Sequence, residues 1–361
     1  MLPLTLRCYN TPDGSCINPA GTVMKKAMNR RDFLKFSSIV LLGAALPPPG
    51  DEEPASEPPP ASLGRIAGGW RQPVHEEARL KSAVTAYKLY DEIIPLLGAV
   101  LGEAPWPSNP IWYQTSEGYI HSALVQPVEN RPSSGPAPVT PPGIWVQVSV
   151  PIAETRLKPN APRVSRRIYY GSVYRAVDAL QDDSGEWWYR LQDGIAYRPG
   201  PYVLASSLRH LSPTTLAPIS SDRPDKKVIV DLARQELTCF EGEMPVLSTR
   251  TATGFGAYHT PRGEYEVVRK SHTSYMIGGA GADYYNLPGV SFPTYFTRTA
   301  IAVHGTYWHN DYGRPRSHGC VNAPPAAAKW VFIWTTPEVP YHPGLARGRG
   351  SSTRISVQYE A

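Results

Sequence analysis

The chain has 361 residues, enough for two or three domains that each have a hydrophobic core. Its 39 prolines and 30 glycines, against 19% charged residues, indicate a loop-rich and mostly β protein. The formal net charge is +5, but residues 1–46 hold six Lys and Arg against two Asp, a net of +4. The remaining +1 is too small to favour nucleic acid as a partner, so this class of function is excluded.

Residues 30–46, "RRDFLKFSSIVLLGAAL", begin with paired arginines and continue as an apolar run. The run from residue 36 to 46 is too short to span a bilayer, and its length suits the hydrophobic part of an export signal. The segment resembles a twin-arginine signal, and the Arg-Arg-x-Phe-Leu-Lys core is matched by Arg30, Arg31, Phe33, Leu34 and Lys35.

This resemblance implies that residues 1–46 are an export region, with Met28 or Met24 as alternative starts. A cleavage site is only approximated, at residues 44–46, so cleavage is left open. We expect the folded protein to work at the outer face of the cytoplasmic membrane or in the cell wall. The Pro-rich stretch that follows cannot bury an apolar face, and we interpret residues 47–74 as a tether.

Two further Pro-rich linkers, 131–143 and 214–225, divide the remaining chain into modules at 75–130, 144–213 and 226–361. The first two modules contain an internal repeat, in which residues 96–128 align with residues 169–211. The matched positions are Gly98 with Gly171, Trp112-Tyr113 with Trp188-Tyr189, Gly118 with Gly194, and Tyr119-Ile120 with Tyr202-Val203.

Both repeated modules resemble bacterial Src-homology-three-like β-barrels, most clearly in the endings "GYIHSALVQPV" and "PYVLASSLRHL". The spacing within residues 76–94 also allows a helix, and only the repeat favours strands there. Two roles stay open for the modules: binding of cell-wall peptide or glycan through exposed aromatic side chains, or spacing.

The last module has a different pattern. We predict strands at 227–232 and 235–241, and a third strand that runs into residues 253–254. Further strands are expected within 260–271 and at 352–360, and another strand ends at His304. Residues 324–335, "PPAAAKWVFIWT", are the one clear helix, with prolines in its first turn. The sequence therefore predicts a β-rich domain with one main helix.

The segment "HGTYWHNDYGRPRSHGCVN", residues 304–322, concentrates the candidate functional side chains. A zinc site from His304, His309, His318 and Cys320 has suitable ligand types but lacks the usual paired spacing. A disulfide between Cys239 and Cys320 would not require the histidines. An inert buried cysteine would not explain why a glycine follows both His304 and His318.

A fourth interpretation is a cysteine nucleophile. A thiolate attacks a carbonyl, so we expect the pKa of Cys320 to be lowered by an imidazole and by the N-terminus of the following helix. Gly319 permits a sharp turn, so that neighbouring backbone N–H groups can converge on an oxyanion. His304 would be the base, with its second ring nitrogen held by a main-chain carbonyl.

His304-Gly305 followed by Ser317-His318-Gly319-Cys320-Val321-Asn322 resembles the signature of the L,D-transpeptidase (YkuD-type) family. The resemblance extends over residues 226–361 and implies a β-sandwich-like fold in which two sheets enclose the helix. By position it implies a nucleophile at Cys320, a base at His304, an orienting carbonyl at Gly305, an oxyanion frame at His318, Gly319 and Cys320, and bracing residues at Ser317 and Asn322.

The resemblance also implies an activity. The cysteine would attack a peptidoglycan tetrapeptide stem, release D-alanine and pass the acyl group to an amine, giving a 3→3 cross-link or a wall anchor, without a metal or cofactor. An L,D-carboxypeptidase with the same acyl-enzyme, and a non-catalytic wall-binding module, stay open as alternatives. We expect a monomer, and we interpret residues 271–297 as a substrate-side lid with candidate contacts at Tyr275, Tyr285 and Tyr295.

Overall fold

The structure is a computed structural model that describes residues 62–104, 109–192 and 200–359, together with the short strands β1 (Tyr9–Asn10), β2 (Cys16–Ile17) and β3 (Val23–Met24). The chain divides into two units, Met1–Pro59 and Pro60–Ala361. The twin-arginine segment and the proline-rich stretch up to residue 61 lie outside the described residues. Within the described part, no helix has the length and apolar character needed to cross a membrane.

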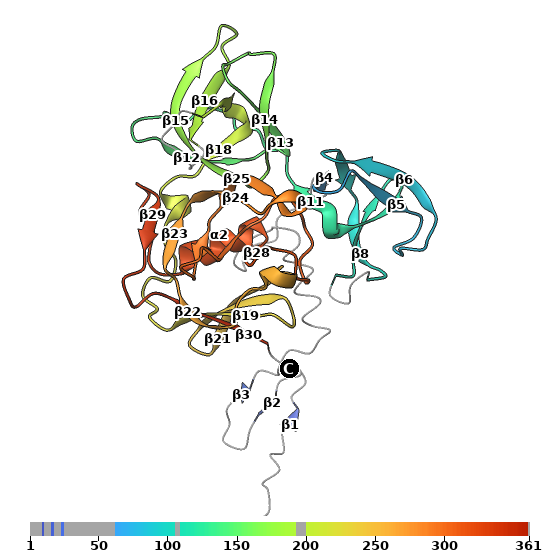
Figure 1. Ribbon diagram of the computed structural model, residues 1–361, viewed down its shortest axis with the longest axis vertical. Helices are drawn as coiled ribbons and strands as arrows, with labels where there is room; N and C mark the ends of the chain where they lie inside the picture. Colours follow the sequence, from blue (N-terminus) through green and yellow to red (C-terminus); the bar gives the residue numbers. More distant parts are fainter. Residues whose placement is uncertain are drawn as a thin grey trace, which may run out of the picture. The chain divides into compact units, whose positions relative to one another are not determined.

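The first module of the second unit is built from two small sheets (Figure 1). One has the strand order β6-β5-β10-β9-β8 and the other the order β11-β4-β7. The elements are β4 (Ser62–Ile66), β5 (Arg71–His75), β6 (Val84–Leu89), β7 (Ile93–Leu96), β8 (Gly98–Leu101), β9 (Ile111–Thr115), β10 (Gly118–His121), η1 (Ser122–Leu124) and β11 (Val125–Val128).

Two details of this module differ from the sequence interpretation. Strands β4 and β5 lie within the stretch assigned to a tether, so the folded part begins at residue 62 instead of 75. They belong to the module because β4 pairs with both β7 and β11 and thereby buries Ile66 in its core. The segment 76–94 is not helical: it supplies strands β6 and β7.

The second module is one sheet with the order β14-β13-β17-β16-β15-β12-β18. Its elements are β12 (Ile144–Val148), β13 (Ile152–Arg156), β14 (Val164–Tyr169), β15 (Val173–Gln181), β16 (Trp187–Gln192), β17 (Tyr202–Leu204), η2 (Ala205–Ser207) and β18 (Leu208–His210). A 3-10 turn, η3 (Thr214–Leu216), follows. Both modules end with the same order of elements, which is two strands, a 3-10 turn and a last strand. The aligned residues Trp112 and Trp188 are buried in the first and the second module, respectively.

The predicted barrels are not closed. In the described residues the strand order of the second module runs from β14 to β18 without returning, and the first module splits into two sheets. The likeness to Src-homology-three domains therefore stays a prediction. Both modules nevertheless bury alternating side chains in cores of their own, because successive side chains of a strand point to opposite faces.

The C-terminal domain holds the single α-helix of the described residues, α2 (Pro325–Trp334), between two five-stranded sheets. The sheets have the orders β21-β20-β19-β30-β22 and β28-β27-β26-β23-β29, and β24 and β25 form a separate hairpin. The strands are β19 (Lys226–Asp231), β20 (Glu236–Glu241), β21 (Met244–Arg250), β22 (Gly263–Glu266), β23 (Arg269–Ser271), β24 (Thr273–Gly278), β25 (Tyr285–Ser291), β26 (Thr294–Tyr295), β27 (Ala302–Gly305), β28 (Val321–Ala323), β29 (Leu345–Arg347) and β30 (Arg354–Gln358).

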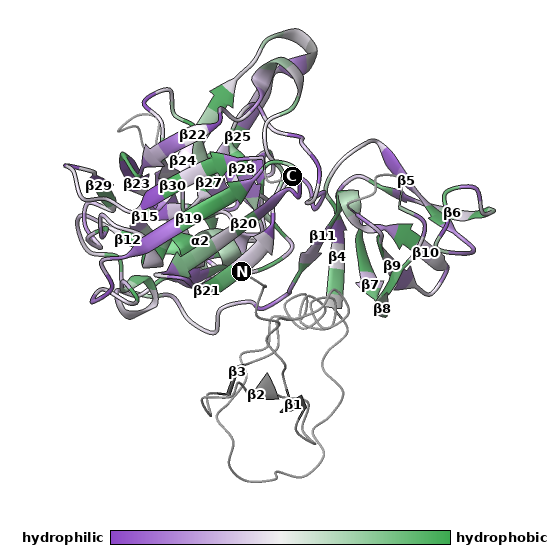
Figure 2. Cartoon of the chain, turned by 90° about the horizontal axis from the view of Figure 1, so that it is seen from below, coloured by the Kyte–Doolittle hydropathy of each residue, from purple (hydrophilic) through white to green (hydrophobic). Residues whose placement is uncertain are grey.

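The core of this domain joins both sheets to the helix (Figure 2). Val230 comes from one sheet, Val303 from the other, and Val331 and Trp334 from α2, and all four are almost fully buried. Pro325 opens α2, where a missing N–H removes no helical hydrogen bond. The mostly β fold with one main helix is confirmed.

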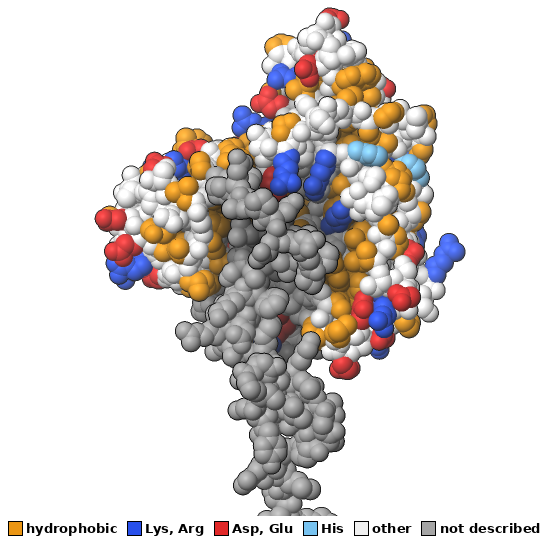
Figure 3. All heavy atoms as spheres, turned by 180° about the vertical axis from the view of Figure 1, so that it is seen from behind, with side chains coloured by type: hydrophobic (Ala, Val, Ile, Leu, Met, Phe, Trp, Pro, Cys, Tyr) orange, Lys and Arg blue, Asp and Glu red, His pale blue; other side chains and the backbone are white. Residues whose placement is uncertain are grey.

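One face of the described residues carries charged side chains of both signs. On the side shown in Figure 3, acidic and basic side chains are interspersed over the described residues, apart from a short row of basic ones. This distribution agrees with the small net charge that remains once the N-terminal region is set aside.

Candidate active site

Two short parallel strands bring the conspicuous histidine and cysteine segments together. Strand β27 pairs with β28 in a register that places His304 opposite Asn322 and Val303 opposite Val321. Both strands are buried along their whole length, which fixes their register. Cys320 immediately precedes β28, so it enters the site beside the strand that carries His304.

His304 is buried, and its Nδ1 lies 3.1 Å from the carbonyl oxygen of Gly305. Burial lowers the pKa of His304 to about 4, because the charged imidazolium is poorly solvated there. The imidazole is therefore neutral at neutral pH. Since a carbonyl only accepts, Nδ1 carries the proton and donates to Gly305, which leaves Nε2 as the basic nitrogen.

Cys320 is partly exposed, with its Sγ 3.9 Å from the carbonyl oxygen of Ala300. Burial raises the pKa of the Cys320 thiol to about 11, and a hydrogen bond from the backbone of Ala302 acts in the opposite direction. This differs from the expected lowering of the pKa. The physical reason is that β28 and Pro324 separate Cys320 from α2, so the thiol does not lie at a helix N-terminus.

The turn before Cys320 is held by side-chain hydrogen bonds. Ser317 Oγ donates to the carbonyl of Cys320 and accepts the N–H of Gly319 at 3.1 Å. Gly319 has φ of +108°, a backbone conformation that residues other than glycine rarely adopt. Thr260 Oγ1 donates to the Gly319 carbonyl at 2.7 Å. Because the Gly319 N–H is engaged, His318 and Cys320 supply the available candidate donors for an oxyanion.

Aromatic rings flank His318. Tyr258 lies 4.5 Å and Tyr285 5.0 Å from the His318 ring, measured between centroids. Burial raises the pKa of the Tyr285 hydroxyl, and the nearby Cys320 adds to the effect. Tyr285 is therefore placed at the mouth of the site, and Tyr258 joins it although the sequence analysis did not identify it.

The other two tyrosines of the predicted lid lie elsewhere. Tyr295 is 4% exposed, and its hydroxyl donates to Ser274 Oγ at 3.0 Å, so it is mainly a core residue near Cys320. Tyr275 donates to Asn286 Oδ1 at 2.6 Å. The lid segment itself is the β24–β25 hairpin, joined by the 3-10 turn η5 (Gly281–Asp283).

His309, one of the side chains considered as a zinc ligand, braces the site. Its Nε2 lies 2.9 Å from the side-chain amide of Asn322, and its Nδ1 accepts the N–H of Asp311 at 3.1 Å. The Asn322 atom that faces Nε2 is Nδ2. Because Nδ1 accepts the Asp311 N–H, Nε2 carries the proton, and the amide satisfies it when turned over so that Oδ1 accepts. Burial keeps the pKa of His309 well below its ordinary value, so this tautomer persists at neutral pH.

The loop between His304 and Ser317 is also fastened to the first module. The N–H of Asn310 donates to the Ala123 carbonyl at 2.8 Å, and its side chain donates to the Tyr113 hydroxyl at 3.1 Å. Arg65 donates to the Tyr307 carbonyl. Sequence reasoning had no signal for these contacts, because they join segments about 190 residues or more apart.

The alternative chemistries can be compared with this geometry. In the described residues, no three His, Cys, Asp or Glu side chains are grouped so that they could hold a metal ion. Cys239 and Cys320 are both free thiols, and Cys239 lies fully buried in β20, within the core of the domain. The arrangement around Cys320 is that of a thiol with a neutral histidine on the adjacent strand.

Comparison with known proteins identifies the class of this domain. Residues 225–344 match the YkuD family model, described as the L,D-transpeptidase catalytic domain, and this third of the chain contains His304, Cys320 and α2. A search of curated proteins gave no match.

Solved structures of L,D-transpeptidases are similar to part of the chain. One from Mycobacterium smegmatis is 22% identical, with a TM-score of 0.31, over 37% of this chain and 58% of that one. The catalytic domain from E. faecium is 24% identical over 37% of this chain and 98% of its own, with a TM-score of 0.30. L,D-transpeptidase 1 from Mycobacterium tuberculosis is 19% identical over 37% of this chain and 61% of its own, with a TM-score of 0.28. The chain thus spans under two thirds of the M. smegmatis chain.

Proposed function

We propose that the protein is an exported peptidoglycan L,D-transpeptidase in which Cys320 is the nucleophile and His304 the base. The observation that carries this proposal is the parallel pairing of β27 with β28, which sets the Cys320 turn beside a buried, neutral histidine. The family match of residues 225–344 supports the same class of reaction.

The first half-reaction forms a thioester. The Cys320 proton moves to Nε2 of His304 while Sγ attacks the carbonyl carbon between the third, diamino residue of the stem and D-alanine. The N–H groups of His318 and Cys320 donate to the developing oxyanion. When the tetrahedral adduct collapses, the C–N bond breaks, and the leaving amine of D-alanine takes the proton from His304.

The second half-reaction transfers the acyl group. The side-chain amine of another stem attacks the thioester carbonyl and loses a proton to His304. The C–S bond then breaks, an amide forms, and the proton returns to Cys320. Gly305 holds the imidazole by Nδ1 through both steps, so that Nε2 alone exchanges the proton.

The two pKa values describe the resting enzyme. With a pKa of about 11 for the Cys320 thiol and of about 4 for the His304 imidazole, both groups are neutral at neutral pH. A preformed thiolate is therefore not the attacking species in the free enzyme. Proton transfer accompanies the attack, when the substrate and the oxyanion donors stabilise the new charge.

Intact-mass measurement of an acyl adduct tests the proposal. We expect the protein to gain the mass of a carbapenem or of a stem acyl group, to lose this gain in Cys320→Ala, and to acylate more slowly in His304→Ala. Incubation with a tetrapeptide stem and an amine acceptor should release D-alanine and yield a dimer. A trimmed tripeptide without dimer would assign the protein to the carboxypeptidases, and no adduct at Cys320 would overturn the catalytic proposal.

Export is a separate part of the proposal and rests on the arginine pair at residues 30 and 31. Replacing both arginines by lysine should retain the protein inside the cell, because a twin-arginine route reads the guanidinium pair. Fractionation of cells that express either form gives the answer, and equal export of the two forms would reject the route.

A further inference from the structure

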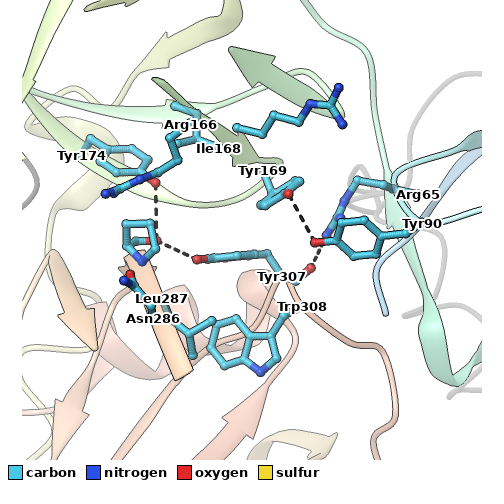
Figure 4. Close-up of a pocket in the computed structure, with 12 residues that line it drawn as sticks. Arg65, Tyr90, Arg166, Ile168, Tyr169, Tyr174, Asn286, Leu287, Tyr307 and Trp308 are labelled. Carbon is cyan, nitrogen blue, oxygen red and sulfur yellow. Dashed lines mark hydrogen bonds between the residues drawn. The ribbon is translucent and has the colours of Figure 1, made fainter. Parts of the chain in front are cut away.

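Arg65, in strand β4 of the first module, is a buried arginine beside a cavity that residues of all three modules line (Figure 4). Its guanidinium makes four hydrogen bonds. Nε and Nη2 donate to Gln126 Oε1 at 3.1 and 2.9 Å, and Nη1 donates to Asp91 Oδ1 at 2.9 Å. Nη2 also donates to the carbonyl oxygen of Tyr307, so the first module binds the main chain of the catalytic domain directly.

The charge of Arg65 is balanced within this contact. Asp91 is its ion-pair partner, and Asp91 Oδ2 accepts hydrogen bonds from Arg167 at 3.1 Å and from the Tyr169 hydroxyl at 3.3 Å, both in the second module. The guanidinium also lies 4.0 Å from the centroid of the Tyr169 ring, which stacks on Tyr307. The arginine is therefore held by two modules, and its charge strengthens the hydrogen bond to the carbonyl of the third.

Tyr307 follows the group that orients the candidate base. Two residues before it, the Gly305 carbonyl accepts the Nδ1–H of His304 at 3.1 Å. This carbonyl and the N–H of Thr306 belong to one peptide unit, and the N–H donates to a carbonyl of β28 at 3.1 Å. One hydrogen bond leaves a peptide unit free to rotate about it. Arg65 restricts this rotation, because it holds the chain at the Tyr307 carbonyl.

The second module contains a matching pair with a different reach. Arg65 lies opposite Gln126 in the pairing of β4 with β11, and Gln147 lies opposite Arg209 in the pairing of β12 with β18. In both pairs the arginine donates to the glutamine Oε1. Arg209, however, is exposed and binds Gln147 within its own module. The pair itself thus belongs to the module fold, and the bond to Tyr307 distinguishes Arg65.

We propose that Arg65 is a positioning residue for the reaction at Cys320. By holding the Tyr307 carbonyl, it keeps the Gly305 carbonyl in line with Nδ1 of His304, so that Nε2 remains the basic nitrogen. This inference rests on the proposed function, and it assigns the first module a part in catalysis.

Carbapenem acylation of full-length variants tests the proposal. Arg65→Met combined with Asp91→Asn removes the donor to Tyr307 without leaving a buried charge unpaired, and asparagine suits the positive φ of residue 91. We expect the first-order rate constant of acylation to decrease about tenfold, because a misplacement of about 1 Å can cost about 100-fold in rate. The half-saturating carbapenem concentration should change by less than about twofold. Arg209→Gln breaks the matching pair and should change neither value.

The tautomer of His304 is a readout that does not depend on acylation. Nitrogen NMR of isotopically labelled histidine rings shows which ring nitrogen carries the proton, and His304→Ala assigns the signal. We expect Nδ1–H in the wild type and in Arg209→Gln, and a mixture of both tautomers in the double variant. Arg65→Lys keeps a charge beside Asp91 but loses the planar fork, so it should show the same two changes should the double variant fail to fold.

Thermal unfolding shows which variants are folded at the assay temperature. If Cys320 is acylated and the folded Arg65 variants keep the wild-type rate constant and tautomer, Arg65 is a structural contact only, and the proposed function stands. If the wild type is not acylated but the tautomer changes with Arg65, the enzymatic proposal fails and the positioning of His304 stands. An equal decrease of the rate constant in Arg209→Gln would also contradict the role of Arg65.

Discussion

Asn322 and His309 are joined side chain to side chain at 2.9 Å, and both are almost fully buried. Asn322 is the residue of β28 that lies opposite His304, two positions after Cys320. The contact therefore couples the loop that leaves the candidate base to the strand that follows the candidate nucleophile.

Replacing His309 by alanine should impair both stability and acylation. The substitution leaves the Asn322 amide and the Asp311 N–H without a buried partner, which costs about 1–3 kcal/mol for such groups. We expect a lower unfolding temperature and a slower single-turnover acylation by a carbapenem. His259→Ala, at an exposed position, is the control and should change neither. Wild-type acylation and stability in His309→Ala would show that the contact positions nothing.

The thiol of Cys320 should lose its proton at a higher pH than an ordinary cysteine thiol does. With a pKa of about 11, its thiolate fraction increases about tenfold for each pH unit from 7 to 10, and iodoacetamide alkylation should follow this increase. Peptide mass analysis distinguishes Cys320 from Cys239, whose burial should prevent reaction in the folded protein. An alkylation rate that is half-maximal near pH 8.5 and levels off above it, as for an ordinary thiol, would contradict the raised pKa.

Buried neutral histidines should make the fold sensitive to acid. Burial lowers the pKa of His304 to about 4 and that of His272 to about 3, so between these values and about 6.5 the unfolded chain binds more protons than the folded one. The free energy of unfolding should therefore decrease as the pH falls below about 6.5, by roughly 1 kcal/mol per pH unit for each histidine.

His272→Phe isolates one of these groups. Neither ring nitrogen of His272 has a hydrogen-bond partner among the described residues, and the ring packs against Trp145 and Phe332. We expect His272→Phe to be more stable than the wild type in urea unfolding at pH 5, with a smaller difference at pH 8. An equal difference at both pH values would mean that His272 does not titrate in this way.

Local patterns were sufficient to predict most elements of the catalytic domain. Alternating apolar residues gave β19 and β20, and prolines followed by an apolar stripe gave α2. Spacing alone also brought His304 and Cys320 into one candidate site. These features depend on residues that are neighbours in the chain, so they can be predicted from a single sequence.

The remaining features depend on contacts between distant segments. Residues 62–66 follow directly on the Pro-rich stretch and were predicted as part of its tether, whereas pairing with β7 and β11 makes them strand β4. The raised pKa of Cys320 reflects its surroundings, which include a strand in place of the expected helix N-terminus. His309 has no local feature that separates it from an ordinary loop histidine, and only the fold brings it to Asn322.

The hydroxyl of Tyr113 should matter for catalysis, whereas that of its repeat counterpart should not. Tyr113 accepts a hydrogen bond from Asn310 in the loop between His304 and Ser317, and Tyr189 bonds to Ala137 in the second module. We expect Tyr113→Phe and Tyr189→Phe to lose about 1 kcal/mol of stability each. Only Tyr113→Phe should slow carbapenem acylation, and equal rates in the two variants would show that the first module does not position the loop.

Gly289 should tolerate alanine far less well than Gly281 does. Both glycines have positive φ, +67° and +59°, so alanine costs each a similar amount of backbone strain. A Cβ on Gly289 would lie 2.4 Å from the Tyr174 ring, whereas a Cβ on Gly281 meets nothing within 4 Å. The difference in unfolding free energy between the two variants should therefore be about 1–3 kcal/mol, because the buried tyrosine or β25 must move. Since β25 also carries Tyr285, we expect slower acylation in Gly289→Ala alone, measured by intact mass over time. Equal stabilities and rates in the two variants would mean that the contact between β25 and the second module does not constrain the site.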